Sequence, residues 1–329
     1  MSGSKRNISK VKKKVQWLSN DILVSSGIKS LKLPEKGSCT LLYHGIDDGK
    51  TERYNSKFIS ENRLLQQLQW LKENTEIVST EEIFKNDSIS SNFKVAISFD
   101  DGFLNNYKYV LPLIEKLKIP VTVFVSAINL KGEKFLWPDA MDLLAVNGPK
   151  HIEVQNVIFN KTGSGYENGD GVSLKSTAIK KGYDFAKEAL DHLNYSKLEL
   201  NKYANDLWEM MGDEEIKLMS KSKYVTIGSH GVTHDSFTEV SEIQLLEELS
   251  QSKKYLEELI DASVDQIAFP YGHFNSKVVD VCMKAGYRFQ FAVEMDSKDV
   301  GDKRVQGRLG INPFISWANQ VKAIGSGKY

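Results

Sequence analysis

The chain has 329 residues, of which 41% are hydrophobic and 26% are charged, and these proportions are typical of folded globular proteins, not of disordered or fibrous chains. Lysine plus arginine and aspartate plus glutamate both number 43, so no basic surplus is available to neutralise a phosphate backbone and we expect no nucleic-acid partner. A neutral substrate fits this charge balance better.

Residues 1–38 form a basic N-terminal extension in which lysines at positions 10 and 12–14 precede apolar residues of the segment 15–24. This pattern predicts an amphipathic helix that either packs on the main domain or makes peripheral contact with an anionic membrane. We see no uninterrupted apolar run typical of an export signal, and no run of about 18 apolar residues that could span a membrane. The sequence therefore predicts a cytoplasmic chain without a transmembrane segment.

Residues 39–329 alternate short apolar runs with helical periodicity, which is typical of β-α units around a largely parallel sheet. We expect strands at residues 40–44, 95–100, 121–125, 225–229, 266–269 and 289–293. Amphipathic helices are expected between them, for example at residues 58–72 and 241–260. The two cysteines, Cys39 and Cys282, have no metal-ligand spacing and are interpreted as buried thiols.

The rhythm breaks at about residues 135–222, which hold a Gly-rich, acidic segment at 163–171 followed by lysine-rich helical segments. We interpret this region as a mainly helical insertion with a loop at 163–171. Insertions at strand ends often shape a substrate cleft, and a purely structural excursion is the alternative.

Three polar segments each follow an expected strand. Asp100 and Asp101 come first, and two adjacent carboxylates at a strand end can converge on one cleft, although a solvated turn is the alternative. His230 and His234 come next, and histidines four residues apart on a helical turn present both rings to one metal ion. The third segment, 267–272, ends in Pro-Tyr-Gly, a turn that can aim a backbone N–H into a site.

In this order, the segments 98–102, 228–234 and 267–272 resemble the motifs of the polysaccharide deacetylase family, carbohydrate esterase family four, whose members remove acetyl groups from N-acetylated sugars. The resemblance spans roughly residues 40–312 apart from the insertion, and it includes the segments 42–46, 119–125 and 284–287. The Tyr43-His44 pair is similar to that of the exopolysaccharide-modifying branch.

The resemblance implies a distorted (β/α) barrel with the site at the C-terminal ends of its strands. It implies that Asp100 is the general base and that Asp101, His230 and His234 hold a divalent metal, which we expect to be zinc, although cobalt, nickel or iron accept similar ligands. Such a metal would acidify bound water and polarise the amide carbonyl. The backbone N–H of Tyr271 is expected to help hold the oxyanion.

Two departures from the family pattern affect the expected mechanism. Many members carry an arginine where this chain has Ala268, so another group must orient Asp100, and Arg308 is our candidate, with a structural or solvated arginine as the alternative. Many members also place the protonating histidine late in the chain, but no histidine follows His273 here.

Four histidines lie outside the metal motif, and they differ as candidates for the acid that protonates the leaving amine. His44 is our first choice, because it ends the first expected strand, and His273 is the second. His151 and His192 lie in the insertion and are interpreted as surface residues.

The sequence therefore predicts a metal-dependent hydrolase that removes an N-acetyl group from a sugar or glycan intermediate and releases acetate. The substrate could be nucleotide-linked, lipid-linked or a free oligosaccharide. One alternative is a hydrolase of non-sugar amides, because the motifs specify an amide and a metal only. A second is a catalytically silent carbohydrate-binding scaffold, although all four of Asp100, Asp101, His230 and His234 are present.

Overall fold

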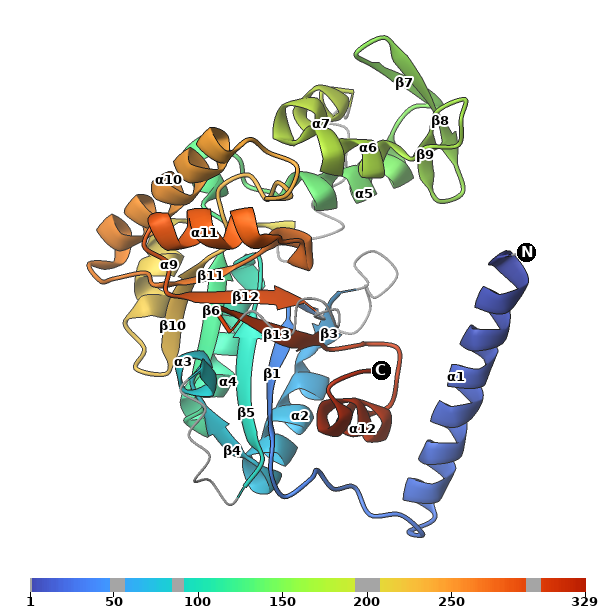
Figure 1. The fold of residues 1–329 in the computed structure, drawn as a ribbon, viewed down its shortest axis with the longest axis vertical. Coiled ribbons are helices and arrows are strands. Elements are labelled where there is room, and N and C mark those ends of the chain that lie inside the picture. The colour runs from blue at the N-terminus through green and yellow to red at the C-terminus, as the bar shows by residue number, and fades with distance from the viewer. Residues whose placement is uncertain (1, 48–56, 85–91, 193–207, 294–302) are drawn as a thin grey trace.

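A computed structural model of the chain describes residues 2–47, 57–84, 92–192, 208–293 and 303–329. Seven parallel strands close into a barrel (Figure 1). Their order around the ring is β1 (Ser38–Tyr43), β13 (Val305–Gly310), β12 (Phe289–Val293), β11 (Gln266–Ala268), β10 (Val225–Ser229), β6 (Val121–Val125) and β5 (Lys94–Phe99). Pairing of β5 with β1 completes the ring. The predicted barrel is confirmed.

Amphipathic helices surround the barrel because each buries one apolar stripe against the strands. They are α2 (Glu61–Asn74), α3 (Thr80–Phe84), α4 (Leu111–Leu117), α9 (Asp213–Ser220), α10 (Glu242–Ile260), α11 (Ser276–Lys284) and α12 (Trp317–Ser326). Helix α10 begins at a capping box in which the Ser241 hydroxyl accepts from the N–H of Gln244, and it buries Leu245, Leu249 and Leu256. The strand ends therefore sit on a rigid, covered core.

Two strands of the main parallel sheet were not predicted. The short β4 (Glu76–Val78) pairs with the start of β5 outside the ring. The second is β13, whose sequence contains Gly307, Gly310 and the charged Arg308. Residues of this kind interrupt an apolar strand pattern. The arginine is tolerated inside the barrel because a buried carboxylate pairs with it, as described below.

The insertion has a hydrophobic core of its own, in which Trp137, Phe159, Phe185 and Trp208 are all buried. The predicted helices are present, but the insertion also contains an antiparallel sheet that was not predicted. Besides α5 (Trp137–Asn147), α6 (Leu174–Lys181) and α7 (Tyr183–Leu190), it contains an antiparallel sheet of β7 (His151–Val154), β8 (Val157–Thr162) and β9 (Gly165–Glu167). Strand β9 lies within the segment predicted as a loop, because the Tyr166 side chain is buried in this second core.

The N-terminal extension contains a helix, α1 (Ser2–Ser25), which docks on α12 through polar side chains. Buried Asn20 donates to Asn319 at 3.1 Å. Val15 and Leu18 are 61% and 62% exposed. Contact of these residues with a membrane stays a prediction. Among the described residues, no helix is both long and apolar enough to span a membrane.

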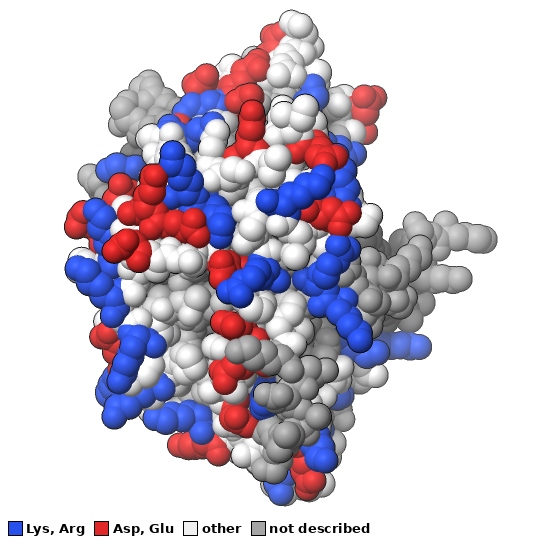
Figure 2. All heavy atoms as spheres, turned by 60° about the vertical axis from the view of Figure 1, so that its left-hand side comes forward, with Lys and Arg blue, Asp and Glu red and all other residues white. Residues whose placement is uncertain are grey.

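Basic and acidic side chains intermingle on the face of the molecule shown in Figure 2. No single sign of charge dominates this face. Such a surface provides no broad electrostatic field for a highly charged polymer.

Candidate metal centre

Asp101, His230 and His234 are buried at the carboxyl ends of β5 and β10, where one ligand atom of each lies within 4.8 Å of the other two. Oδ1 of Asp101 lies 3.5 Å from Nε2 of His230 and 3.3 Å from Nε2 of His234. This oxygen is buried and has no hydrogen-bond partner among the described residues. One carboxylate oxygen and two imidazole nitrogens form a donor set that suits zinc and similar divalent ions, with coordination positions left open.

A left-handed turn after β5 brings the two aspartates together. Asp101 and Gly102 have φ values of 74° and 86°, and a Cβ on Gly102 would lie only 3.1 Å from the Val125 side chain. Glycine therefore fits both the backbone angle and the close approach of β6. Oδ2 of Asp100 lies 3.9 Å from Nε2 of His230, so both carboxylates face the same histidine, as their position at a strand end predicted.

His230 directs Nε2 toward the cluster because its other ring nitrogen, Nδ1, is hydrogen-bonded on the opposite side of the ring. Nδ1 lies 2.9 Å from the carbonyl oxygen of Ala268, and a carbonyl can only accept, so Nδ1 carries the proton and Nε2 keeps its lone pair. Burial lowers the pKa of His230 to about 4. The ring is therefore neutral at pH 7, which is the protonation state that binds a metal.

The two histidines do not lie on a helical turn, and that part of the prediction was wrong. Residues 230–236 form an irregular loop in which Gly231 and His234 have φ values of 78° and 59°. The loop has this shape because Glu248 of α10 holds it from the side. The Glu248 carboxylate accepts hydrogen bonds from the N–H groups of Val232 and Thr233, at 2.8 and 2.9 Å.

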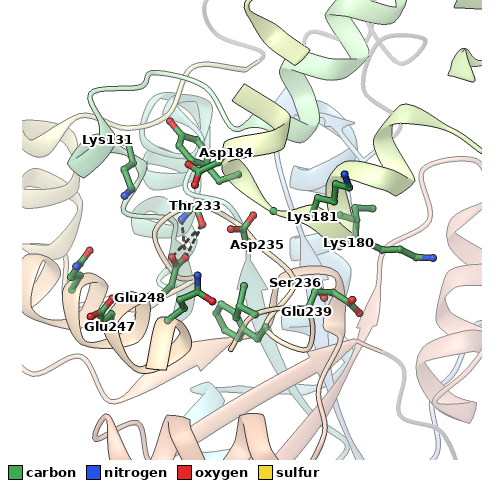
Figure 3. Close-up of a pocket in the computed structure, with 17 residues that line it drawn as sticks. Lys131, Lys180, Lys181, Asp184, Thr233, Asp235, Ser236, Glu239, Glu247 and Glu248 are labelled. Atoms are coloured by element: carbon green, nitrogen blue, oxygen red, sulfur yellow. Dashed lines mark hydrogen bonds between the residues drawn. The ribbon is translucent and has the colours of Figure 1, made fainter. Parts of the chain in front are cut away.

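Figure 3 shows the outer side of this loop, where Thr233 and Glu248 join in the drawn hydrogen bonds. A polar cavity of about 300 Å³ lies between the loop, the start of α10 and the junction of α6 with α7. Asp235 lines it one residue beyond His234. The insertion and the barrel thus meet against the loop that carries the histidines.

Arg308 lies against Asp100 with its guanidinium fully buried. Its Nη1 and Nη2 donate to the two oxygens of Asp100 at 2.6 and 2.8 Å, and Nη1 also donates to Ser98 Oγ at 3.2 Å. Burial alone would raise the pKa of Asp100, but Arg308 and His230 favour the carboxylate and lower the pKa below its ordinary value. Arg308, which comes from β13, therefore makes the contact with Asp100 that we expected an arginine other than residue 268 to make.

The remaining predicted residues lie around the rim. His44 is half-buried at the end of β1, and burial, with Lys57 adding to it, lowers its pKa to about 4. Tyr271 has a φ of 60°, and its ring centre lies 4.8 Å from that of His234. His273 is exposed, with Nδ1 3.1 Å from Ser236 Oγ. His151 and His192 are exposed, as expected, in the insertion.

Sequence reasoning missed three residues beside the candidate metal ligands. Nζ of Lys57 lies 3.2 Å from Oδ2 of Asp101 and 3.8 Å from Oδ1 of Asp139. Asp139 and Trp137 come from the first turn of α5 in the insertion. Burial alone would lower the pKa of Lys57, but the two carboxylates raise it, so it stays an ammonium. No motif marks these positions, because only the folded insertion brings them to the barrel.

Known proteins are similar to this chain over most of its length. The model of the family described as polysaccharide deacetylase matches residues 88–156 and 176–290. The poly-beta-1,6-N-acetyl-D-glucosamine N-deacetylase of Staphylococcus aureus (strain NCTC 8325 / PS 47) is 23% identical over 280 residues, which cover 81% of this chain and 75% of the relative.

Two solved structures share the fold. The Streptococcus pyogenes deacetylase PplD in complex with acetate has a TM-score of 0.56 at 17% identity, over 88% of this chain and 99% of that one. IcaB from Ammonifex degensii has the same TM-score at 19% identity, over 89% and 99%. At these identities the likeness concerns the fold alone.

Proposed function

Because the chain belongs to the polysaccharide deacetylase family, we propose that it hydrolyses the N-acetyl amide of a hexosamine unit in a glycan, with a divalent metal held by Asp101, His230 and His234. The observation that carries the proposal is the buried cluster of these three ligands beside the ionised pair of Asp100 and Arg308. The unpartnered Oδ1 of Asp101 supports the metal, because a buried carboxylate oxygen without a donor is costly.

A divalent ion bound there would polarise the amide carbonyl and acidify water. Asp100 is the general base that takes the proton from the attacking water. Arg308 keeps the Asp100 carboxylate ionised and fixes its plane through two parallel hydrogen bonds. The N–H of Tyr271, which follows Pro270 at the end of β11, donates to the oxyanion that forms from the carbonyl.

The leaving amine needs a proton, and Asp100 can return the one that it took. Arg308 lowers the pKa of Asp100, so the protonated acid gives up its proton readily. His44, our first choice from the sequence, has a pKa of about 4 without substrate and is neutral at pH 7, when it has no extra proton to give. We therefore prefer Asp100 as acid as well as base, with His44 and then His273 as the alternatives.

The His44→Ala variant separates these assignments. If Asp100 returns the proton, kcat should fall less than about tenfold, whereas loss of a general acid costs about 10²–10⁴-fold. The same measurement on His273→Ala tests the second alternative. Metal content and thermal stability, measured on both variants, exclude a trivial loss of the fold.

The test of the function itself is acetate release from β-1,6-linked N-acetylglucosamine oligosaccharides, because a relative named for that polymer aligns with most of the chain. Metal-stripped protein, reloaded with zinc, cobalt, nickel or iron, should regain activity with at least one ion, and we expect zinc to serve. Metal and sugar binding without acetate release would identify a silent scaffold. Acetate release only from non-sugar amides would identify the chain as a hydrolase of non-sugar amides.

A further inference from the structure

One wall of the metal centre carries buried polar atoms that lack partners. Among the described residues, Nε1 of Trp137, Oδ2 of Asp139 and the hydroxyl of Tyr271 are buried and form no hydrogen bond. Trp137 and Asp139 are each only 2% exposed. We call these three residues the polar wall.

The polar wall stands beside the metal ligands. Lys57 links Asp139 to Asp101, at 3.8 and 3.2 Å from its Nζ. The ring centre of Trp137 lies 6.4 Å from that of Tyr271, whose own ring packs edge-on against His234. Both contact chains end on a metal ligand, so any group bound at the polar wall lies next to the reacting amide.

The lack of partners calls for a physical explanation. Most buried polar side-chain atoms in folded proteins find a hydrogen-bond partner, and each exception costs free energy. Oδ2 of Asp139 is one of these exceptions, and Oδ1 of the same carboxyl group lies 3.8 Å from Nζ of Lys57, which is longer than a hydrogen bond. Groups of this kind are kept where a ligand completes them, and they cluster at functional sites.

We propose that the polar wall binds the hydroxyl groups of the sugar ring that bears the N-acetyl group, and so selects a pyranose over a plain amide. This inference rests on the proposed deacetylation. The chemistry is complementary, because the Trp137 indole can only donate, the Asp139 carboxyl group accepts when ionised and the Tyr271 hydroxyl does both. Sugar hydroxyls donate and accept at neighbouring carbons. Lys57, whose side chain is 36% exposed, lies beside Asp139 and borders the polar wall toward solvent.

Three variants remove one polar feature each with little change of shape: Trp137→Phe, Asp139→Asn and Tyr271→Phe. The last keeps the backbone N–H assigned to the oxyanion. The matched control is Tyr166→Phe, which removes a hydroxyl that donates to Pro149 in the same insertion, away from the polar wall. Metal content is measured on every variant, because Asp139 also contacts Lys57.

The substrates are an N-acetylglucosamine oligosaccharide and the same compound with single ring hydroxyls replaced by hydrogen. We expect kcat/KM on the parent sugar to fall about 3- to 10-fold for the two aromatic variants and about 10- to 100-fold for Asp139→Asn, with metal content unchanged. For each variant, the difference in kcat/KM from the wild type should largely disappear on one deoxy sugar, because that sugar lacks the hydroxyl that the mutated side chain would bind. The control should match the wild type.

Binding of the parent sugar in the Asp100→Asn background, measured by calorimetry, should weaken in the same order. Unchanged kcat/KM and affinity in all three variants, or equal losses on every deoxy sugar, would overturn the polar wall as a sugar site. Ordered waters that still satisfy the three atoms in a sugar-bound crystal would also overturn it. Failure of the proposed function is a separate result, because the wild-type protein would then release no acetate from any sugar.

Discussion

The barrel side and the insertion side of the metal centre are built in opposite ways. On the barrel side, partners hold Asp100, His230 and the histidine loop, namely Arg308, the Ala268 carbonyl and Glu248. Oδ1 of Asp101, Nδ1 of His234 and the Tyr271 hydroxyl are exceptions among the described residues there that bear on the site. On the insertion side, Trp137 and Asp139 are buried without comparable partners. The barrel thus fixes Asp100 and His230 through protein contacts, whereas the polar atoms of Trp137 and Asp139 are those that we propose for the sugar.

The strongest challenge to the barrel side is removal of a metal ligand. His230→Ala and His234→Ala should each lose stoichiometric metal and all measurable acetate release, because the two ligands that remain cannot hold the ion in a catalytic geometry. Metal analysis after dialysis, together with the acetate assay, measures both effects. Full metal occupancy in either variant would contradict the ligand assignment.

Asp100→Asn should keep the metal and lose turnover by about 10²–10⁴-fold, since general-base assistance contributes that much. The asparagine preserves shape but cannot take a proton. The measurement pairs kcat with metal content. Retained turnover in a metal-loaded variant would transfer the base role to another group.

The loss of kcat/KM in Arg308→Met should be smaller at high pH than at low pH. Loss of the cation removes what holds the pKa of Asp100 down, so the acid limb of kcat/KM should move to higher pH. The variant should also lose about 3–5 kcal/mol of unfolding free energy at neutral pH, because a buried charge is left alone.

The stability difference between wild type and Arg308→Met should narrow in acid. A carboxyl whose pKa is lowered on folding adds stability above its unfolded pKa and loses it as the pH falls through the folded pKa. Denaturant titrations at several pH values measure this, with Arg308→Lys as a partial replacement. An unchanged acid limb would mean that Arg308 is purely structural.

Glu248→Gln should weaken metal binding by roughly tenfold, within the range seen when outer-shell partners of metal sites are changed. The amide oxygen still accepts from the histidine loop, but without the negative charge that strengthens these hydrogen bonds. Metal titration with a competing chelator measures the dissociation constant. Glu247→Gln, on the same helix but exposed, is the matched control, and equal losses in both variants would argue against positioning by Glu248.

Deletion of residues 1–28 should have the smallest effect on the reaction. Helix α1 docks on α12, away from the residues of the metal centre, so kcat/KM should stay within about twofold. The melting temperature should fall by a few degrees, because Asn319 loses its contacts with Asn20 and Asp21. A large loss of kcat/KM would show that the extension supports the site.

The parts of the site that the sequence predicts are those carried by single strands. Asp100, Asp101 and His230 follow apolar runs directly, so strand periodicity alone brings them to one end of the barrel. The family resemblance then supplied roles that periodicity could not. The spacing argument was wrong about the backbone geometry of the histidine loop, because the spacing of two histidines does not reveal the distant Glu248 that shapes it.

The parts that the sequence did not predict depend on pairing between distant elements. β13 was missed because its arginine looks polar until Asp100 is seen opposite it, although Arg308 itself was a candidate. Lys57 and Asp139 lie more than 80 residues apart in the chain, and they come together only when the insertion folds onto the barrel. Local sequence patterns carry no information on a contact between residues so far apart.

The position of Arg308 on β13 has a consequence for when the chain can become active as it folds during synthesis. β13 follows the other six barrel strands in sequence, and it pairs with β1, the first of them, and with β12. Until it docks, a nascent chain can own every metal ligand and still lack the cation that keeps Asp100 ionised. If Asp100 is the base, as proposed, we expect a chain in which β13 has not docked to lack hydrolytic activity even when the three proposed metal ligands are in place.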